Sequence, residues 1–254
     1  MPEDILYGAI KMYQPGEGEG PRVNVDTVLL AHFARVGASS RAVELGCAHG
    51  AVALILAARR VYSRKEQPRT VPQIEAVDIN PELIDMAEKN AELNGLSGEV
   101  RFRVSDIREH RKDFECGVYD AVIMNPPYVE AGCGRPSPNE AMAQAAHGSA
   151  CSLADVASAA KFLLRNGGKF YVIIRARRAA ELFSLLHARN VKPKRARFVH
   201  PKPDREASSV LVEAVRASGD GITIEPPLFI YGADGEYTDG LLEAYRLGDA
   251  PCRS

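Results

Sequence analysis

The stretch Ala42-Val43-Glu44-Leu45-Gly46-Cys47-Ala48-His49-Gly50 decides the fold of this 254-residue chain. Its apolar beginning predicts a β-strand, its glycines predict a tight turn, and the apolar run 51–58 predicts a helix. Gly46 and Gly50 let a ligand approach the backbone above a helix N-terminus. The stretch is therefore typical of a nucleotide-type binding unit, although its glycine spacing differs from that of the dinucleotide fingerprint.

Two further predicted strands end in acidic residues. The strand 73–77 is followed by Asp78, whose carboxylate can accept two hydrogen bonds from a ribose diol, and the strand 99–104 ends near Asp106. The carboxyl ends of parallel strands meet at one edge of an open α/β sheet, and ligands bind there. An Asp in this position is also a common turn or cap residue, so each of these two has a structural alternative.

Strands and helices alternate along the chain, which predicts an α/β fold with helices on both faces of the sheet. The last two strands have no helix between them, which predicts an antiparallel edge hairpin on a seven-stranded, mostly parallel sheet. Pro81 and Gly95 should bracket one helix, and the capping box Ser152–Asp155 should open another that Gly167-Gly168 ends. After the first strand, which leads into the glycine turn, strands are expected at 73–77, 99–104, 119–124, 169–174, 191–199 and 208–215. The remaining helices are expected at about 49–61 and 178–188.

Asn125-Pro126-Pro127-Tyr128 directly follows the apolar run 119–124. The Asn side-chain oxygen and the Pro126 carbonyl are two acceptors, and the tyrosine offers a flat ring for stacking. They suit an amino group on a conjugated ring or carbonyl, whose lone pair is freed when two acceptors favour its pyramidal geometry. Asn and Pro are also frequent turn formers, so a plain turn is the alternative. We predict catalytic roles for Asn125, Pro126, Pro127 and Tyr128.

These motifs carry a resemblance over roughly residues 10 to 245. The chain resembles class I methyltransferases of the Asn-Pro-Pro-Tyr type that use S-adenosylmethionine, most of all the bacterial enzymes that methylate adenine N6 next to the anticodon of a valine tRNA. The segments that carry the resemblance are 13–15, 22–31, the glycine turn, 77–80, 125–128 and Phe198-Val199-His200-Pro201-Lys202. Ala48 departs from the usual glycine, and its methyl group would crowd the cofactor if the backbone there has a positive φ.

The resemblance implies a Rossmann-like fold, S-adenosylmethionine as cofactor and direct methyl transfer that needs no strong base. It implies that Asp78 binds the ribose, that Asp106 lies near the adenine amine, and that Asp26 and Thr27 lie near the methionine end. The full set of expected cofactor contacts is Asp26, Thr27, Glu44, Gly46, Cys47, Gly50, Asp78, Ile79, Asp106, Ile107 and Asn125.

A basic stretch points to a polyanionic substrate. Ten Lys or Arg between Arg175 and Arg205 are opposed only by Glu181 and Asp204, a balance of +8, so the rest of the chain carries −9 to give the total of −1. Such a stretch can hold tRNA on one face, although exposed charge runs are often only solvated. The long connection 129–150 is expected to form a lid or substrate loop. The expected substrate contacts are Arg135, Lys194, Arg195, Arg197 and Lys202.

Other functions share parts of this pattern. A glutamine methyltransferase of release factors also acts on a nitrogen whose lone pair is delocalised, here that of a side-chain amide. Such enzymes carry a helical region before the cofactor turn, and the roughly 40 residues before Ala42 leave little room for one. A DNA adenine methyltransferase needs a target-reading region, and the segment after Val215 is short. An RNA-binding protein without catalysis is the third alternative, because Ala48 could weaken cofactor binding.

Composition sets the remaining bounds. We expect a flap and entry over residues 1–35, a methyltransferase domain over 36–216, and an extension over 217–254 packed on the same domain. The five cysteines form no Cys-x-x-Cys pair, and the six histidines form no metal-ligand spacing, so we predict free thiols and no metal. The sequence has no run of 18 apolar residues and its start lacks the regions of a signal peptide. We therefore expect a cytoplasmic enzyme with no membrane partner.

Overall fold

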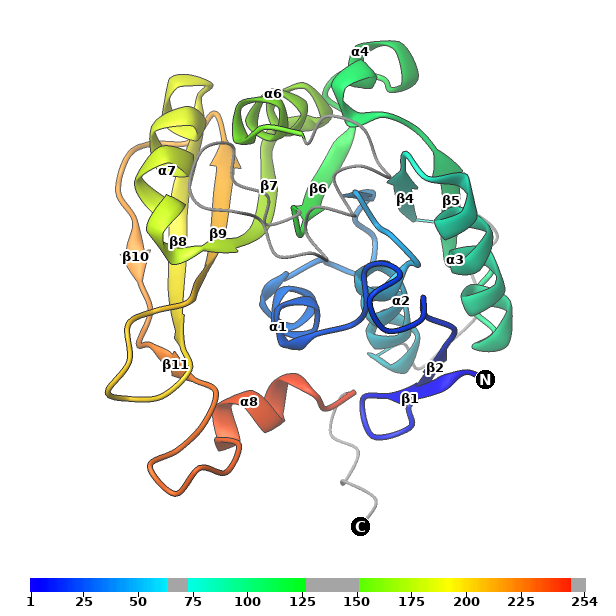
Figure 1. Cartoon of the computed structure of the whole chain (residues 1–254). Helices are drawn as coiled ribbons and strands as arrows, with labels where there is room; N and C mark the ends of the chain where they lie inside the picture. The colour runs from blue at the N-terminus through cyan, green and yellow to red at the C-terminus, as the bar shows by residue number, and fades with distance from the viewer. Residues whose placement is uncertain (64–72, 127–150, 248–254) are drawn as a thin grey trace.

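The computed structural model describes residues 1–63, 73–126 and 151–247 (Figure 1). Its strands are β1 Glu3–Ile5, β2 Ile10–Met12, β3 Ala42–Leu45, β4 Ile74–Asp78, β5 Val100–Val104, β6 Tyr119–Met124, β7 Leu164–Arg175, β8 Val191–His200, β9 Ser209–Arg216, β10 Thr223–Ile224 and β11 Leu228–Phe229. Within the described residues, β1 and β2 form a small hairpin, and nine strands form one sheet in the order β10-β8-β9-β7-β6-β3-β4-β5, with β11 also paired to β8.

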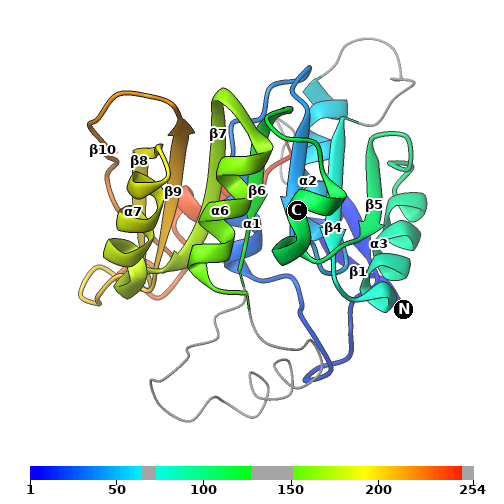
Figure 2. The same ribbon diagram turned by 90° about the horizontal axis from the view of Figure 1, so that it is seen from above.

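Helices cover both faces of this sheet. They are α1 Val25–Phe33, α2 Ala51–Ser63, α3 Pro81–Leu93, α4 His110–Asp113, α6 Leu153–Leu163, α7 Ala179–Ala188 and α8 Asp239–Ala244, with the short 3-10 helices η1 Ile107–Glu109 and η2 Ala176–Arg178. The core residues of α1, α2 and α3 pack in one apolar cluster and those of α6 and α7 in another. Figure 1 shows α1 and α2 on one side of the sheet and α6 on the other, and Figure 2 shows α3 beside β5 at one end and α7 beside β8 at the other.

The predicted fold class is confirmed. The strands from β3 to β7 run parallel, and β9 pairs antiparallel with both β7 and β8. The prediction of seven strands was wrong in number, because β10 and β11 extend the sheet beyond β8. Each of these two strands has only two residues, which is too short to show an alternating pattern in the sequence.

The prediction that Gly167-Gly168 ends α6 was also wrong. The helix ends at Leu163, and β7 begins at once with Leu164 opposite Tyr119. The pairing shifts register before it resumes at Lys169, so the glycines lie in an irregularity of the strand. The capping box Ser152–Asp155 at the start of α6 and the helix start at Pro81 are both confirmed.

Helix α1 was missed by the sequence analysis, which predicted a flap over 1–35. Most of its residues are buried, among them Leu29 and Leu30, and they pack between α2 and β7. Because the helix is apolar on nearly all sides, it lacks the amphipathic period by which a surface helix is recognised.

The glycine turn supplies the first testable prediction. Gly50 has φ +88°, and a Cβ atom built there would lie 2.9 Å from the Phe102 ring and 3.0 Å from the Cβ of Ala87. Gly50→Ala should therefore lower the free energy of unfolding by about 2 to 4 kcal/mol, from backbone strain and overpacking together. Urea unfolding measures this loss. Gly98→Ala is the matched control because no heavy atom lies within 4 Å of its Cβ; equal effects of the two changes would contradict the prediction.

Candidate active site at the carboxyl edge of the sheet

Three of the predicted site residues meet where the parallel strands end, which we call the carboxyl edge. Leu45 at the end of β3 lies opposite Val77 of β4 on one side and Met124 of β6 on the other. The residues that follow are Gly46, Asp78 and Asn125. Segments far apart in the sequence therefore place a glycine turn, a carboxylate and a carboxamide side by side.

Asp78 is held by backbone donors from two turns. Its Oδ2 accepts the N–H of Ala48 at 2.8 Å, and its Oδ1 accepts the N–H of Asn80 at 3.0 Å. A carboxylate has about four acceptor positions, so about two are left after these bonds. The half-buried side chain is thus fixed in place with acceptor capacity for a diol.

The backbone of the glycine turn is left-handed at three positions. Gly46, Ala48 and Gly50 have φ values of +68°, +49° and +88°. The departure at Ala48 therefore falls on a position with positive φ, where an L-residue costs roughly 1 to 2 kcal/mol. The bond from its N–H to Asp78 helps hold that conformation.

Glu44 and Cys47 support the turn from within the core. Oε2 of Glu44 accepts the N–H of Ala53 at 2.8 Å, in the first turn of α2, where a negative group is favoured. Burial raises the pKa of Glu44 well above its usual range, the bond from Ala53 opposes this rise, and the charge of Asp78 adds to it. Burial likewise raises the pKa of the Cys47 thiol. Both side chains are almost fully buried, so their predicted cofactor contacts stay predictions.

Asp106 and Ile107 follow the end of β5, and Ile79 follows the end of the neighbouring strand β4. Asp106 caps η1 and pairs with Arg108 at 2.6 Å; the hydrogen bonds from the Arg108 side chain lower the pKa of Asp106, against the effect of partial burial. Ile107 is buried, whereas Ile79 beside Asp78 is 41% exposed. An exposed isoleucine next to a fixed carboxylate suits a flat ring that carries a sugar.

Asp26 and Thr27 lie in the first turn of α1. The Thr27 hydroxyl belongs to a capping box with Asn24, and Asp26 accepts a hydrogen bond from the buried Ser209 at 3.2 Å. Because Ser209 begins β9 opposite Arg175 at the end of β7, this contact brings the start of α1 to the carboxyl edge.

The sequence analysis missed a strap that fastens the N-terminal segment over the glycine turn. Asn90 of α3 is fully buried, and its side chain bonds both the N–H and the carbonyl of Tyr13 and also the carbonyl of His49. Arg22 pairs with Glu3 at 2.6 Å and donates to the Pro15 carbonyl. The one signal in the sequence was an asparagine on the core side of an amphipathic helix, which calls for partners.

His49 is the second residue that the sequence analysis missed. Its side chain is 2% exposed, and neither ring nitrogen has a hydrogen-bond partner among the described residues. Burial lowers the pKa of His49 to about 4, and the Arg22 charge lowers it further while Glu3 opposes. The ring is therefore neutral near pH 7.

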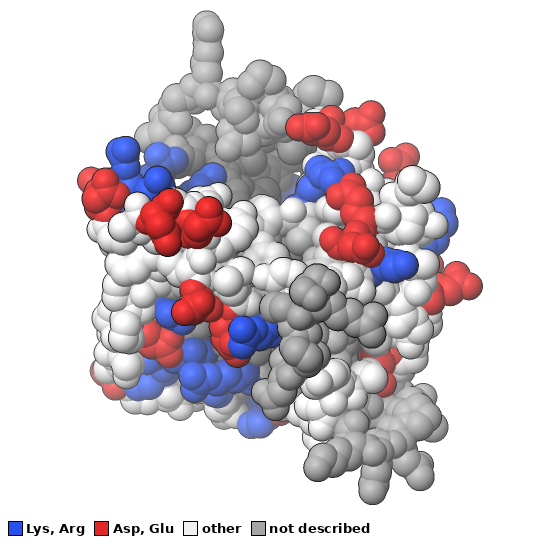
Figure 3. All heavy atoms as spheres, turned by 90° about the horizontal axis from the view of Figure 1, so that it is seen from below, with Lys and Arg blue, Asp and Glu red and all other residues white. Residues whose placement is uncertain are grey.

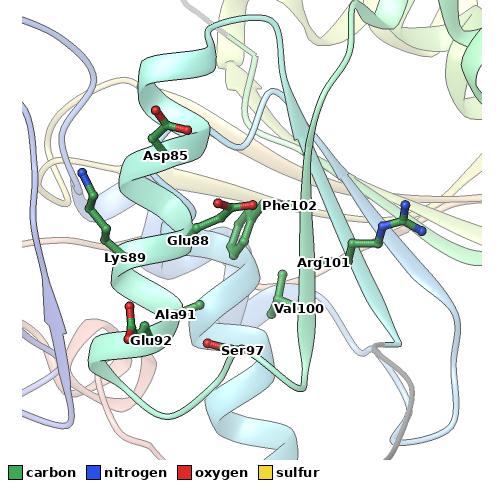
Figure 4. Close-up of a pocket in the computed structure, with 9 residues that line it drawn as sticks. All are labelled: Asp85, Glu88, Lys89, Ala91, Glu92, Ser97, Val100, Arg101 and Phe102. Carbon is green, nitrogen blue, oxygen red and sulfur yellow. The ribbon is translucent and has the colours of Figure 1, made fainter.

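A groove of about 750 Å³ lies away from this edge, between α3 and β5. Figure 4 shows Asp85, Glu88 and Lys89 on the helix and Phe102 on the strand. These residues come from the middle of α3 and the first part of β5, so the groove is not formed by the strand ends. None of the predicted site residues that the structure describes lines this groove.

The predicted substrate contact at Arg195 needs correction. The guanidinium pairs with Glu213 at 2.9 Å and Glu225 at 3.1 Å, lies 3.7 Å from the centre of the Phe33 ring, and is only 12% exposed. Arg195 therefore holds the sheet edge together. Arg197 donates to the Pro226 carbonyl. On the face drawn in Figure 3, Lys and Arg lie beside Asp and Glu in several places.

The structure also separates two other predicted contacts. Lys194 donates to backbone carbonyls of Gly219 and Asp220 in the half of β8 far from the carboxyl edge. Lys202 follows the carboxyl end of β8 and is exposed. Pro127, Tyr128, Arg135 and the loop 129–150 lie outside the described residues; of the tetrad, Asn125 is half-buried and Pro126 is buried.

Comparison with known families identifies the class of protein. The family model described as "Methyltransferase small domain" matches residues 22–198, more than half of the chain. The chain belongs to this family and is an enzyme that transfers methyl groups from S-adenosylmethionine.

Named relatives cover nearly the whole chain. A protein of Dyadobacter fermentans named tRNA1(Val) (adenine(37)-N6)-methyltransferase is 24% identical over 89% of this chain and 90% of its own length. A protein of Tolumonas auensis with the same name is 26% identical over 85% of each chain. A crystal structure titled as a predicted O-methyltransferase from Agrobacterium tumefaciens has a TM-score of 0.65 at 22% identity, covering 87% of this chain and 96% of that one, which shows a shared fold.

The positive φ of Ala48 meets the condition under which its methyl group was expected to crowd the cofactor, whereas the rest of the carboxyl edge suits the cofactor. Among the described residues, a Cβ atom built at Gly46 would come within 4 Å only of the end of the Met124 side chain, at 3.8 Å, so these residues leave space beside the backbone of the turn. Asp78 keeps acceptor capacity for a ribose, and Ile79 exposes an apolar surface next to it. None of the described helices is long and apolar enough for a bilayer crossing, and no metal-binding group of His, Cys, Asp and Glu occurs among the described residues.

Asp78 gives a prediction for cofactor affinity. Asp78→Ala should weaken S-adenosylmethionine binding by about 1.5 to 3 kcal/mol, the range for lost hydrogen bonds to a charged group. Isothermal calorimetry on the folded variant measures this. Asp85→Ala, which removes a carboxylate from the groove of Figure 4, is the control and should leave affinity unchanged. Unchanged affinity in the Asp78 variant would rule out the ribose contact.

His49 gives a prediction for the pH dependence of stability. The unfolded imidazole binds a proton near pH 6.5 and the folded one only near 4, so the unfolded state holds more protons between these values. Stability is complete above pH 6.5 and should fall by about 3 kcal/mol as the pH drops to about 4. His49→Leu should remove this part of the acid loss, as measured by urea unfolding across that window, whereas His187→Gln at an exposed position should retain it. An acid loss of the same size in wild type and His49→Leu would refute the assignment.

Proposed function

We propose that this enzyme methylates the exocyclic amine of an adenine in tRNA, at the nucleotide next to the anticodon of a valine tRNA. The observation that carries the proposal is the position of Asn125, one residue past β6 and next to the glycine turn after β3, with Asp78 on the other side of that turn. The relatives named as tRNA1(Val) (adenine(37)-N6)-methyltransferases support the choice of substrate, because they match this chain along most of its length.

The chain's own residues have two tasks in this reaction. The Asn125 oxygen and the Pro126 carbonyl accept the N–H groups of the amine and favour the geometry that frees its lone pair. Asp78 and the glycine turn fix the cofactor so that the amine meets it in line. When bound, S-adenosylmethionine supplies a methyl group activated by a positively charged sulfur. An adenine in an anticodon loop is unpaired, so it can swing into the site at low cost.

The substrate assay separates this proposal from its rivals. The enzyme is incubated with cofactor and, in parallel, with unmodified tRNA, a release factor and a DNA duplex, and each product is analysed by mass spectrometry. We expect N6-methyladenosine in tRNA only. Methylated glutamine in the release factor would overturn the proposal in favour of a protein substrate, and cofactor binding without any product would favour an RNA-binding protein without catalysis.

Asn125 gives the test of the chemistry. Asn125→Ala removes an acceptor whose bond strengthens as the amine becomes pyramidal, so single-turnover methylation of tRNA should slow by about a hundredfold or more. Affinity for S-adenosylmethionine should change little. Asn166→Ala is the matched control, because this exposed asparagine lies at the opposite end of the neighbouring strand β7. A near-normal rate in the Asn125 variant would contradict the catalytic role and favour the alternative that residues 125–128 form only a turn.

A further inference from the structure

The basic stretch is divided between two opposite edges of the sheet. Both β7 and β8 pair antiparallel with β9, so β7 and β8 point the same way. At one end, Ser209 lies between Arg175 of β7 and Val199 of β8; at the other, Val215 lies between Lys169 and Lys192. The first half of β8 therefore lies at the amino edge, and the residues after His200 lie at the carboxyl edge with Asn125.

The cations at the amino edge already have partners. Lys192 lies 3.2 Å from the carboxylate of Asp220 and is 16% exposed. Lys194 donates to the carbonyls of Gly219 and Asp220. Arg195 forms ion pairs with Glu213 and Glu225. The C-terminal segment 219–226 supplies most of these partners. Binding a phosphate here would require breaking contacts that are already made.

The cations at the carboxyl edge are differently placed. Lys202 and Arg205 are exposed, and no ion pair of either side chain is found within the described part of the chain. Arg177 in η2 is exposed as well, although it is not without a partner. The N–H of Ala176 donates to the Ser208 carbonyl, so η2 and the turn after β8 lie against each other.

This group lies at the same edge of the sheet as the proposed methylation site. Met124, just before Asn125, lies opposite Val172 of β7, and Arg177 follows two residues after β7 ends. Arg178 in the same helix is paired with Glu181, and Asp204 and Glu206 share the turn of Lys202 and Arg205. The surface therefore suits separate contacts to individual phosphates better than a uniform positive field.

We infer that Arg177, Lys202 and Arg205, the carboxyl-edge cations, contact the phosphates of the RNA whose adenine enters the site, and that Lys192 and Lys194 take no part. The inference rests on the proposed function, since it names how the tRNA of that reaction is held. Contacts of this kind position the RNA without reading its sequence. They act on binding before and during the reaction alike, so they set KM more than kcat.

Two variants with equal loss of charge test the inference. Lys202→Gln with Arg205→Gln removes cations from the carboxyl edge, and Lys192→Gln with Lys194→Gln removes the same number from the amino edge. Binding of unmodified tRNA is measured by fluorescence anisotropy at several salt concentrations, together with KM, kcat and calorimetric affinity for S-adenosylmethionine.

The carboxyl-edge variant should lower the slope of log K against log salt by about 1.4 to 1.8, since each phosphate contact contributes about 0.7 to 0.9. Its KM for tRNA should rise at least about tenfold, with kcat at saturation and cofactor affinity unchanged. Adding Arg177→Gln should lower the slope further. The amino-edge variant should keep the wild-type slope and KM; Lys194→Gln alone replaces it if the double variant melts early.

The outcomes separate the inference from the proposed function. Wild-type enzyme that neither binds nor methylates tRNA would overturn the proposed function and the inference with it. Wild-type enzyme that methylates tRNA, with a carboxyl-edge variant of unchanged slope and KM, would overturn the inference alone. A larger decrease in salt slope and a larger rise in KM for the amino-edge variant than for the carboxyl-edge variant would also overturn the inference. Such a result would indicate that the RNA binds across the first half of β8.

Discussion

The carboxylate of Asp78 joins the two turns on which the carboxyl edge depends. One oxygen holds the N–H of Ala48 in the turn after β3, and the other holds the N–H of Asn80 before α3. A charge-assisted bond of this kind contributes about 1.5 to 3 kcal/mol, which is enough to offset the cost of a left-handed alanine. The same carboxylate keeps acceptor positions for the cofactor. The stability of the turn and the proposed binding of the cofactor ribose therefore depend on the same side chain.

Much of the fold and the centre of the site could be predicted because their signals are local. Gly46, Asp78 and Asn125 each follow an apolar run, and parallel strands bring their carboxyl ends to one edge whatever the rest of the chain does. The strand register then places the three residues side by side. Helix starts with side-chain caps could also be predicted, as at Ser152, the N-cap of α6. The expected chemistry of the site stays a prediction, because the strand register shows where these residues lie and not what they do.

What could not be predicted depends on partners distant in the sequence. Arg195 looks like any other member of a basic run, yet its partners Glu213 and Glu225 are 18 and 30 residues away. A count of charges treats that run as one surface, whereas β8 carries it from one edge of the sheet to the other. Asn90 was missed for the same reason, since its backbone partner at Tyr13 is 77 residues away. Such contacts leave no period or spacing in the sequence.

The C-terminal segment explains how a nearly neutral protein can direct an anion to one place. Glu225 and the carbonyls of residues 219 and 220 bind the cations of the first half of β8. The strands β10 and β11 pair with the outer edge of β8, β10 in its middle and β11 at its end. Removing one partner from a largely buried ion pair costs about 3 to 5 kcal/mol, so Arg195, which pairs with Glu213 and Glu225, is not available to a weakly held substrate. Within the described residues, no ion pair is found for Lys202 or Arg205, the exposed cations after β8. In the inferred binding mode, a substrate rich in phosphate is directed to the edge that holds Asn125, because Lys192, Lys194 and Arg195 at the opposite edge have partners within the chain itself.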